Sequence, residues 1–342
     1  INVPVYITVG WDEDSAEKHP EWQQVTRNGV LGGKDPFVSF WRHMCLNNRE
    51  YVDLVLAHTA EILDNYEADG LFYDIIFQIG CICNICKKEM KETGLDPAND
   101  EDVRKHDFIA IKNFMEKVSS FIKSKKPDMK IYFNLGYYPD IADTESFSIK
   151  EKIKYNTHIE IESLPSGQWG YNHFPIVVNY HNYRNYELVG MTGKFHKSWG
   201  DFGTLKNLAA LEYECFRMLA NGAKCSIGDQ LHPSGKLDLT VYKRIGEVYR
   251  SVEEKEPWCR DTQKIAEIGV FTAKKDLSDS FAINESDEGA MRMLLELHQP
   301  FDFIDSDVDI NKYKLVILPD NVLLGDKLAN KLKSYIENGG GV

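Results

Sequence analysis

Two kinds of reactive side chain lie close together between Tyr73 and Met90, in the stretch YDIIFQIGCICNICKKEM. The first is Asp74, a carboxylate set in an apolar run, where burial is costly unless the group is paired or functional. One interpretation of Asp74 is a salt-bridged structural acid. The other is a catalytic carboxylate, which requires a second acid facing it.

Candidates for that second acid occur in HIEIESLPSGQWGY, at Glu160 and Glu162. The two residues are two positions apart in an expected strand, so they project from the same face, and Glu162 is nearer the carboxyl end. Two acids on different strands are what glycoside hydrolysis requires, because one attacks or stabilises the sugar cation while the other protonates the leaving oxygen. A separation of about 5 Å would favour retention, and a wider gap inversion.

The second kind is a group of cysteines, Cys81, Cys83 and Cys86, with the spacing C-x-C-x-x-C. A tight turn can bring three such sulfurs within the Zn–S distance of about 2.3 Å, and Cys45 is the candidate for the fourth ligand. Four thiolates leave no open coordination position, so this zinc would be structural, clamping the loop that follows Asp74. The alternative is a set of loop thiols without metal.

The composition narrows the function classes. The chain has 342 residues, of which 43% are hydrophobic, and a formal net charge of -13. This charge would repel phosphate backbones and anionic lipids, which favours a neutral small substrate over nucleic acid. No window is apolar for long enough to cross a bilayer. The cysteines number seven, an odd count in a long chain, which indicates reduced thiols and a cytoplasmic location.

The elements that would position these residues alternate between strands and helices. Strands are expected at Val3–Val9, Gly70–Ile76, Lys130–Leu135, His158–Ser163, Ile176–Tyr180, Lys194–Trp199 and Cys225–Asp229. Helical spacing is found over Tyr51–Tyr66, Ile111–Ile122, Leu205–Ala220 and Leu239–Lys255. This alternation predicts parallel β/α units closed as a (β/α)8 TIM-type barrel. An open doubly wound sheet is the rival fold, but no glycine-rich phosphate turn follows an early strand.

Active sites of such barrels form at the carboxyl ends of the strands. Polar or aromatic residues occur at those ends, namely Asp12, Asp74, Asn134, Glu162, Trp199, Asp201 and Asp229. Aromatic rings suited to stacking on sugars lie in or beside the same segments, namely Trp11, Trp22, Trp41, Trp169, Tyr171 and Trp199. We therefore predict a carbohydrate pocket whose substrate-binding residues are Trp11, Glu160, Trp169, Tyr171, Trp199, Asp201 and Asp229.

The pattern changes after Trp258. A strand over Ile265–Thr272, a helix over Glu288–His298, a strand over Phe301–Asp305, the segment YKLVILPD and a helix before NGGG predict a second, smaller α/β unit.

Several of these motifs resemble known glycosidases. WRHMCLNNREY together with CICNIC resembles the cysteine–zinc cluster of the family 42 β-galactosidases, with Cys45, Cys81, Cys83 and Cys86 in the ligand positions. The tail, from EGAMRMLLELHQPFDFID onward, is similar to the beginning of their glutaminase-like trimerisation domain. DGLFYD resembles the nucleophile motif of α-L-fucosidases, which implies that Asp74 is the nucleophile. IESLPSGQWGY is similar to their Glu-to-WGY segment, which implies an acid/base role for Glu162.

The combination resembles the α-L-fucosidase-related glycosidases, including family 151 and the group called hypothetical glycosyl hydrolase 6. This resemblance implies a barrel over residues 1–260 that begins at its third strand and lacks the first two, followed by a partial glutaminase-like domain over residues 261–342. It also implies a retaining exo-glycosidase of α-L-fucosidase type, with structural zinc, no catalytic cofactor, a homotrimeric assembly and an oligosaccharide or glycoside substrate. A β-galactosidase-like enzyme, a non-catalytic sugar-binding barrel and a zinc-dependent interaction or nucleic-acid module remain as alternatives.

Overall fold

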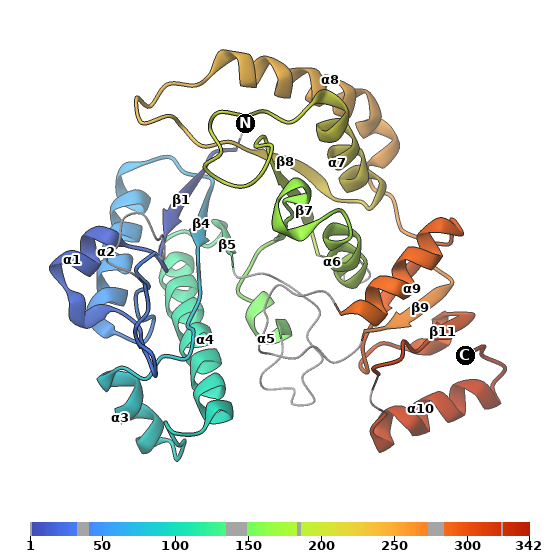
Figure 1. The fold of residues 1–342 in the computed structure, drawn as a ribbon, viewed down its shortest axis with the longest axis horizontal. Helices are drawn as coiled ribbons and strands as arrows, with labels where there is room; N and C mark the ends of the chain where they lie inside the picture. The colour runs from blue at the N-terminus through green and yellow to red at the C-terminus, as the bar shows by residue number, and fades with distance from the viewer. Residues whose placement is uncertain (1, 33–40, 135–148, 183–185, 273–283, 323) are drawn as a thin grey trace. The chain divides into compact units, whose positions relative to one another are not determined.

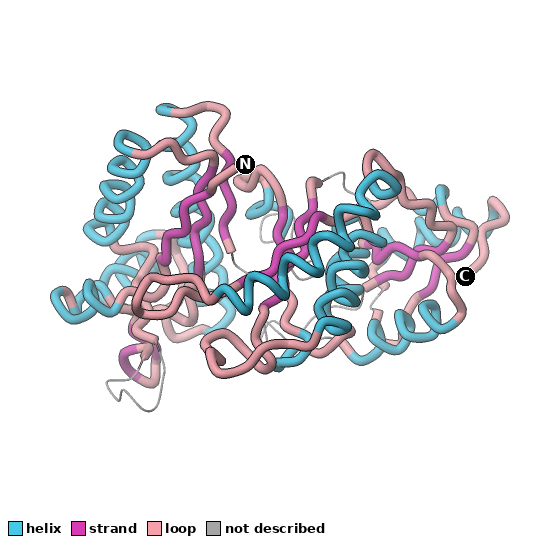
Figure 2. The backbone as a smooth tube through the Cα atoms, turned by 90° about the horizontal axis from the view of Figure 1, so that it is seen from above, coloured by secondary structure: helices cyan, strands magenta, loops and turns pink. Residues whose placement is uncertain are grey.

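The structure, a computed structural model, describes residues 2–32, 41–134, 149–182, 186–272, 284–322 and 324–342. The described residues up to His158 form one compact unit, and those from Ile159 to Val342 form a second. Both units are built from parallel strands connected by helices (Figure 1), and the ends of several strands continue into long loops (Figure 2).

The first unit contains a three-stranded parallel sheet in the order β1-β4-β5. Its strands are β1 (Pro4–Thr8), β4 (Gly70–Asp74) and β5 (Lys130–Phe133). Helix α2 (Arg49–Asn65) connects β1 to β4, and α4 (Asp100–Lys125) connects β4 to β5. The remaining elements are α1 (Glu13–Lys18), a 3-10 turn (Pro20–Trp22), the hairpin β2 (Val25–Thr26) and β3 (Gly29–Val30), α3 (Asn84–Glu92) and α5 (Ile149–Ile153).

Local sequence signals explain the two connecting helices. Asn48 and Asn99 cap α2 and α4, because each side-chain oxygen accepts hydrogen bonds from two backbone N–H groups of the first turn. Tyr51, Val55 and Leu63 are buried on one face of α2, at the helical spacing that the sequence predicted. These two helices pack against each other.

The second unit contains two further parallel sheets of three strands each, in the orders β6-β7-β8 and β10-β9-β11. The first sheet comprises β6 (Ile159–Glu162), β7 (Leu188–Gly193) and β8 (Lys224–Gly228), with α6 (His173–His181), α7 (Leu208–Ala220) and α8 (Leu239–Cys259). The second comprises β9 (Ile268–Phe271), β10 (Phe301–Ile304) and β11 (Leu315–Ile317), with α9 (Glu285–Glu296), a 3-10 turn (Ile310–Lys312) and α10 (Asp326–Glu337). Helix α6 packs against both sheets.

Two expected strands are wrong. The segment Ile176–Tyr180 lies inside helix α6, in which every residue is buried. A run that is apolar on all sides has no period that separates a buried strand from a buried helix. The segment Lys194–Trp199 is a loop, and the strand precedes it at Leu188–Gly193. Glycines at positions 190 and 193 weaken its strand signal. The other expected strands are confirmed within a few residues, although Leu135 lies outside the described residues.

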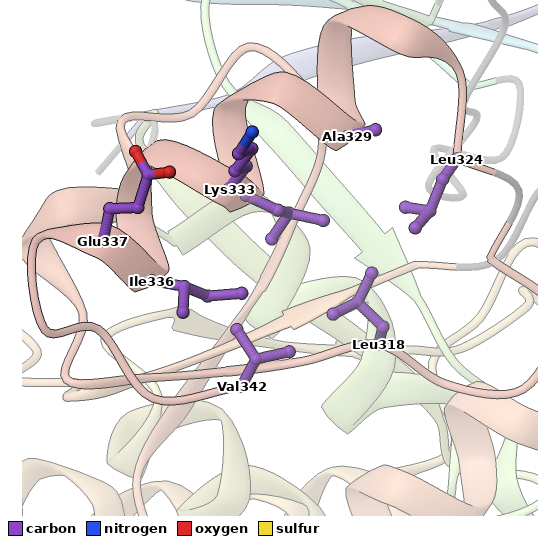
Figure 3. A pocket seen from close by; sticks show the side chains of 8 residues that line it. Leu318, Leu324, Ala329, Lys333, Ile336, Glu337 and Val342 are labelled. Carbon is purple, nitrogen blue, oxygen red and sulfur yellow. The ribbon is translucent and has the colours of Figure 1, made fainter.

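An apolar hollow of about 500 Å³ lies beside α10 (Figure 3). Leu318, Leu332, Ile336 and Val342 line it, and the charged side chains at its edge are Lys333 and Glu337. It contains neither of the predicted catalytic carboxylates. Among the residues that the structure describes, no helix combines the length and the apolar character needed to cross a membrane.

Candidate active site and metal centre

Asp74 is the last residue of β4, paired in register with Thr8 of β1. Each of its carboxylate oxygens accepts a hydrogen bond: Asn134 donates to Oδ1 at 2.8 Å, and the hydroxyl of Tyr6 donates to Oδ2. The backbone N–H groups of Val9 and Asn134 bind the carbonyls of Asp74 and Tyr73, at 3.0 and 2.8 Å. The carboxylate is therefore fixed from neighbouring strands on both sides, which is the orientation control that a nucleophile needs.

The backbone turns sharply after this acid. Ile75 has a φ of 59°, a left-handed conformation that is costly for a β-branched residue. Gly10 makes the turn possible, because a Cβ at that position would lie 1.9 Å from the carbonyl oxygen of Ile75. Strain of this kind persists only where the surroundings enforce it, and it occurs here directly beside the predicted nucleophile.

Trp11 follows β1 in the same unit and stacks on Trp41, with ring centroids 5.0 Å apart and planes 15° from parallel. The indole N–H of Trp11 donates to Nε2 of His43 at 3.0 Å. Burial lowers the pKa of His43 to about 4, so its imidazole is neutral at pH 7 and can accept this bond. Trp41 exposes 51% of its surface, which leaves an aromatic face open to solvent.

Glu162 is the last residue of β6 in the second unit, and Glu160 alternates with it on the same, partly exposed face, as predicted. The indole N–H of Trp199 donates to Oε1 of Glu162 at 2.6 Å. Trp199 lies in the loop after β7 and not at the end of a strand, because β7 already ends at Gly193. The structure thus joins two of the predicted site residues through a direct hydrogen bond.

Asp201 and Asp229 have defined contacts within the second unit. The carboxylate of Asp201 accepts hydrogen bonds from the Thr204 hydroxyl and the Lys197 backbone, and the Thr204 bond lowers the pKa of Asp201. Asp229 follows β8 and lies 3.9 Å from the buried ammonium of Lys194. Asp201 thus stabilises the loop that carries Trp199, and substrate binding by either acid stays a prediction.

Trp169 and Tyr171 follow β6. Trp169 packs on His173, with ring centroids 5.0 Å apart. The hydroxyl of Tyr171 donates to Glu214 at 3.3 Å, and burial raises the pKa of this tyrosine. Substrate binding by these aromatic residues also stays a prediction.

Sequence reasoning missed the acid beneath Tyr171. Glu214 forms a buried ion pair with Lys206 at 2.9 Å, and each side chain is only 3% exposed. The hydroxyl of Thr192 also donates to Glu214, at 2.6 Å. The signal was present in LEYECF, where Glu214 lies on the same helix face as the apolar Leu211.

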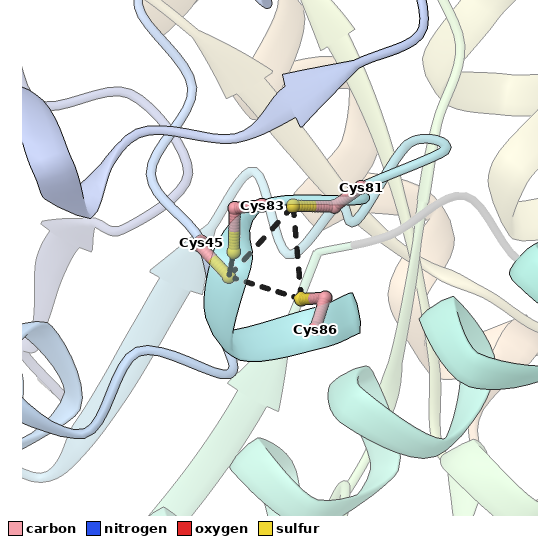
Figure 4. Close-up of side chains that lie close together, drawn as sticks. All are labelled: Cys45, Cys81, Cys83 and Cys86. Carbon is pink, nitrogen blue, oxygen red and sulfur yellow. Dashed lines mark hydrogen bonds between the residues drawn. The ribbon is translucent and has the colours of Figure 1, made fainter. Parts of the chain in front are cut away.

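The four predicted zinc ligands converge in the first unit (Figure 4). All four are buried, and their ligand atoms lie within 4.8 Å of one another. The sulfur of Cys45 lies 3.8 Å from Cys83, 3.6 Å from Cys86 and 3.9 Å from Cys81. A tetrahedron with Zn–S bonds of about 2.3 Å has edges of about 3.8 Å. The donor set therefore fits a tetrahedral Zn²⁺ in both chemistry and spacing.

The surroundings of the sulfurs also suit a charged tetrathiolate. Gln78 donates to the sulfurs of Cys45 and Cys86 at 3.4 and 3.5 Å, and its carbonyl oxygen accepts from the Leu46 backbone. Asp107 accepts from the backbone of Cys81 at 3.2 Å, although burial raises its pKa to about 6. The Gln78 amide thus stabilises negative charge on the sulfurs, as groups around a metal site commonly do.

Mutual contacts separate the pKa values of the four thiols. The pKa values of Cys45 and Cys83 are lowered, because neighbouring S–H groups donate to their thiolates. The pKa values of Cys81 and Cys86 are raised, because ionising them would place further negative charge beside the other sulfurs. A bound cation would displace the remaining protons.

Comparisons with known proteins agree with these motifs. The family profile described as hypothetical glycosyl hydrolase 6 matches residues 1–75, and that described as β-galactosidase trimerisation domain matches residues 291–342. The solved α-L-fucosidase isoenzyme 2 from Paenibacillus thiaminolyticus is 37% identical, with a TM-score of 0.91 over 99% of this chain and 51% of that one. This chain therefore spans about half the length of that relative. A search of curated proteins found no match to this chain.

More distant structures share the fold alone. The β-galactosidase from Rahnella sp. R3 has a TM-score of 0.76 at 13% identity, covering 99% of this chain and 60% of that one. That from Bacillus circulans sp. alkalophilus has a TM-score of 0.73 at 15% identity, with the same coverage. The comparisons confirm the resemblance that the motifs indicated: an α-L-fucosidase-like chain of the hypothetical glycosyl hydrolase 6 type, joined to a β-galactosidase trimerisation segment.

Proposed function

We propose that this protein is a retaining exo-glycosidase that removes a terminal α-L-fucose from an oligosaccharide or glycoconjugate. The observation that carries the proposal is the 37% identity with a solved α-L-fucosidase across 99% of this chain. The carboxylate at the end of β4 supports it independently, because Asp74 is held by two hydrogen-bond donors beside a strained backbone turn.

Asp74 is the nucleophile in this proposal and Glu162 the acid/base. Each is the last residue of a parallel strand, the position at which barrel enzymes carry their catalytic side chains. Attack by Asp74 on the anomeric carbon would form a glycosyl-enzyme, while Glu162 protonates the departing oxygen. Glu162 would then take a proton from the water that releases the sugar.

The proposed architecture is a TIM-type barrel over residues 1–260, to which the parallel strands β1, β4, β5, β6, β7 and β8 would contribute, followed by a trimerisation-type domain over residues 261–342. The parallel pairing within β1-β4-β5 and within β6-β7-β8 supports the barrel. The match of residues 291–342 to a trimerisation domain supports a homotrimer.

The proposed cofactor is one structural Zn²⁺ on Cys45, Cys81, Cys83 and Cys86. The sulfur spacing and the buried donor set support it. Four thiolates would fill the tetrahedral coordination sphere, so no open position would remain for substrate. The role of the ion would be to fix the segment that follows β4. None of the seven cysteines, all of which are among the described residues, forms a disulfide, which suits the proposed reducing, cytoplasmic location.

The open aromatic surfaces would supply the sugar contacts. Trp11 with Trp41 offers a stacked pair in the first unit, and Trp169, Tyr171 and Trp199 lie at the loops of the second. Apolar C–H faces of a hexose ring pack on such side chains, whereas Glu160 and Asp229 can accept hydrogen bonds from hydroxyl groups.

A panel of 4-nitrophenyl glycosides tests the function. We expect release from the α-L-fucoside, and a loss of at least about 100-fold in the Asp74→Asn variant with unchanged circular dichroism. Asp64→Asn, an exposed acid on α2, is the matched control and should retain activity. Release from the β-D-galactoside alone would favour the β-galactosidase alternative, which is supported by the shared fold and the match to the trimerisation segment. Sugar binding without hydrolysis would favour a binding barrel.

A further inference from the structure

The loop after β7 folds back at Trp199 over the ends of neighbouring strands in the second unit. One edge of its indole donates to Oε1 of Glu162, the last residue of β6. Another edge lies over Gly228, the last residue of β8, where a Cβ would come within 2.1 Å of the indole Cη2. Since β7 lies between β6 and β8, one side chain spans the ends of three strands.

The surroundings hold this ring in place. Phe195 packs edge-on against it, with ring centroids 5.3 Å apart. The carboxylate of Asp201 closes the loop through the Lys197 backbone and the Thr204 hydroxyl. Gly167, in the turn after β6, allows that turn to approach, because a Cβ there would lie 2.7 Å from the carbonyl oxygen of Lys197. Gly228 and Phe195 therefore hold the indole itself, and Gly167 lets the turn after β6 pack against the loop that carries it.

We propose that Trp199 is a positioning residue that orients Glu162 for proton transfer and directs its transferable proton to Oε2. This inference rests on the proposed function, in which Glu162 is the acid/base. An indole N–H only donates, so Oε1 must accept. In a protonated carboxyl group the carbonyl-type oxygen is the better acceptor, which places the proton on Oε2. A fixed proton position favours transfer to a leaving oxygen.

Other charged groups share this end of the sheet and must be separated from Glu162 in any titration. Glu160 precedes it by two residues on β6. Lys194 and Asp229 form a pair at 3.9 Å beside Gly228. Asp201 and His196 lie on the loop itself. The Glu162→Gln variant supplies the reference, because it keeps these groups and removes only the carboxyl.

The kinetic test compares leaving groups. A 2,4-dinitrophenyl α-L-fucoside needs little protonation, whereas a fucosyl disaccharide depends on the acid. We expect Trp199→Phe and Gly228→Ala to lower kcat about 10- to 100-fold on the disaccharide and less than about 3-fold on the dinitrophenyl substrate. Gly203→Ala is the matched control, since a Cβ on Gly203 would meet no atom within 4 Å. An equal loss on both substrates, or a rise in KM alone, would show a stacking or structural role and overturn the proposal.

A second readout does not need activity. In the ¹⁵N-tryptophan-labelled protein, the indole resonance of Trp199, assigned from Trp199→Phe, should shift with pH in the wild type. Glu162→Gln should remove the part of that shift that comes from Glu162. A Trp199 resonance that is insensitive to this substitution would overturn the proposal. If no glycoside were hydrolysed while the resonance still followed Glu162, the proposed function would fail and the coupling of Trp199 to Glu162 would be supported.

Discussion

The buried ion pair between Lys206 and Glu214 makes a sharp stability prediction. Both side chains are 3% exposed and their charged atoms lie 2.9 Å apart. Replacing Lys206 by methionine leaves a buried carboxylate, and breaking such a pair costs about 3 to 5 kcal/mol. Thr192 and Tyr171 still donate to Glu214 in this variant. We therefore expect a loss near the lower end, about 3 kcal/mol.

Removing both charges should cost less than removing one. In the double variant Lys206→Met with Glu214→Leu, only the hydroxyls of Thr192 and Tyr171 lose a partner, which corresponds to about 1 to 2 kcal/mol. The double variant should thus be more stable than the single Lys206→Met variant.

Urea unfolding followed by circular dichroism measures these differences. The matched control is Lys224→Met, which removes an exposed pair with Glu187 and should cost less than about 1 kcal/mol. The reasoning is refuted if Lys206→Met is no more destabilising than Lys224→Met. It is refuted equally if the double variant is as unstable as the sum of its two single variants.

Three further outcomes are expected. Mass spectrometry should find one zinc per chain, lost in Cys86→Ser and kept in Cys259→Ser; full zinc in the former would contradict the four-sulfur site. Tyr6→Phe should keep the fold, because Tyr6 is 59% exposed. It should lower kcat about 10-fold, because the Asp74 carboxylate loses the hydrogen bond from the Tyr6 hydroxyl. An unchanged kcat would argue against a role of Tyr6 in orienting Asp74. Burial raises the pKa of Tyr249 from 10.0 to about 12. The free energy of unfolding should therefore be constant with respect to this group below pH 10 and fall by roughly 2 kcal/mol as the pH rises to 12. A Tyr249→Phe variant with the same pH dependence would contradict this.

The sequence allowed prediction of those features that depend on local pattern. The helical spacing of Tyr51, Val55 and Leu63 and the alternation of Glu160 with Glu162 have a period that survives folding. The cysteine cluster was predictable because thiols at short spacing, with one more distant candidate, have few other arrangements.

Features that arise from packing between distant segments were not predictable. Helix α6 is buried on all sides, so its sequence shows no alternation of apolar and polar residues with the helical period. Strand β7 contains Gly190 because a Cβ there would lie 2.4 Å from Met218, a requirement that appears only after α7 packs on the sheet. The donors on Asp74 and the Trp199 bond to Glu162 likewise come from other strands and loops, which no sequence window contains.

Covalent trapping tests the central claim, that Asp74 attacks the sugar, most directly. A 2-deoxy-2-fluoro-α-L-fucosyl fluoride carries a good leaving group, while its fluorine slows release of the enzyme-bound sugar, so the intermediate accumulates. Peptide mass spectrometry should then find one fluorofucosyl group on the peptide containing Asp74, and none in Asp74→Asn. Turnover of the fucoside with the label on a different carboxylate would contradict the account.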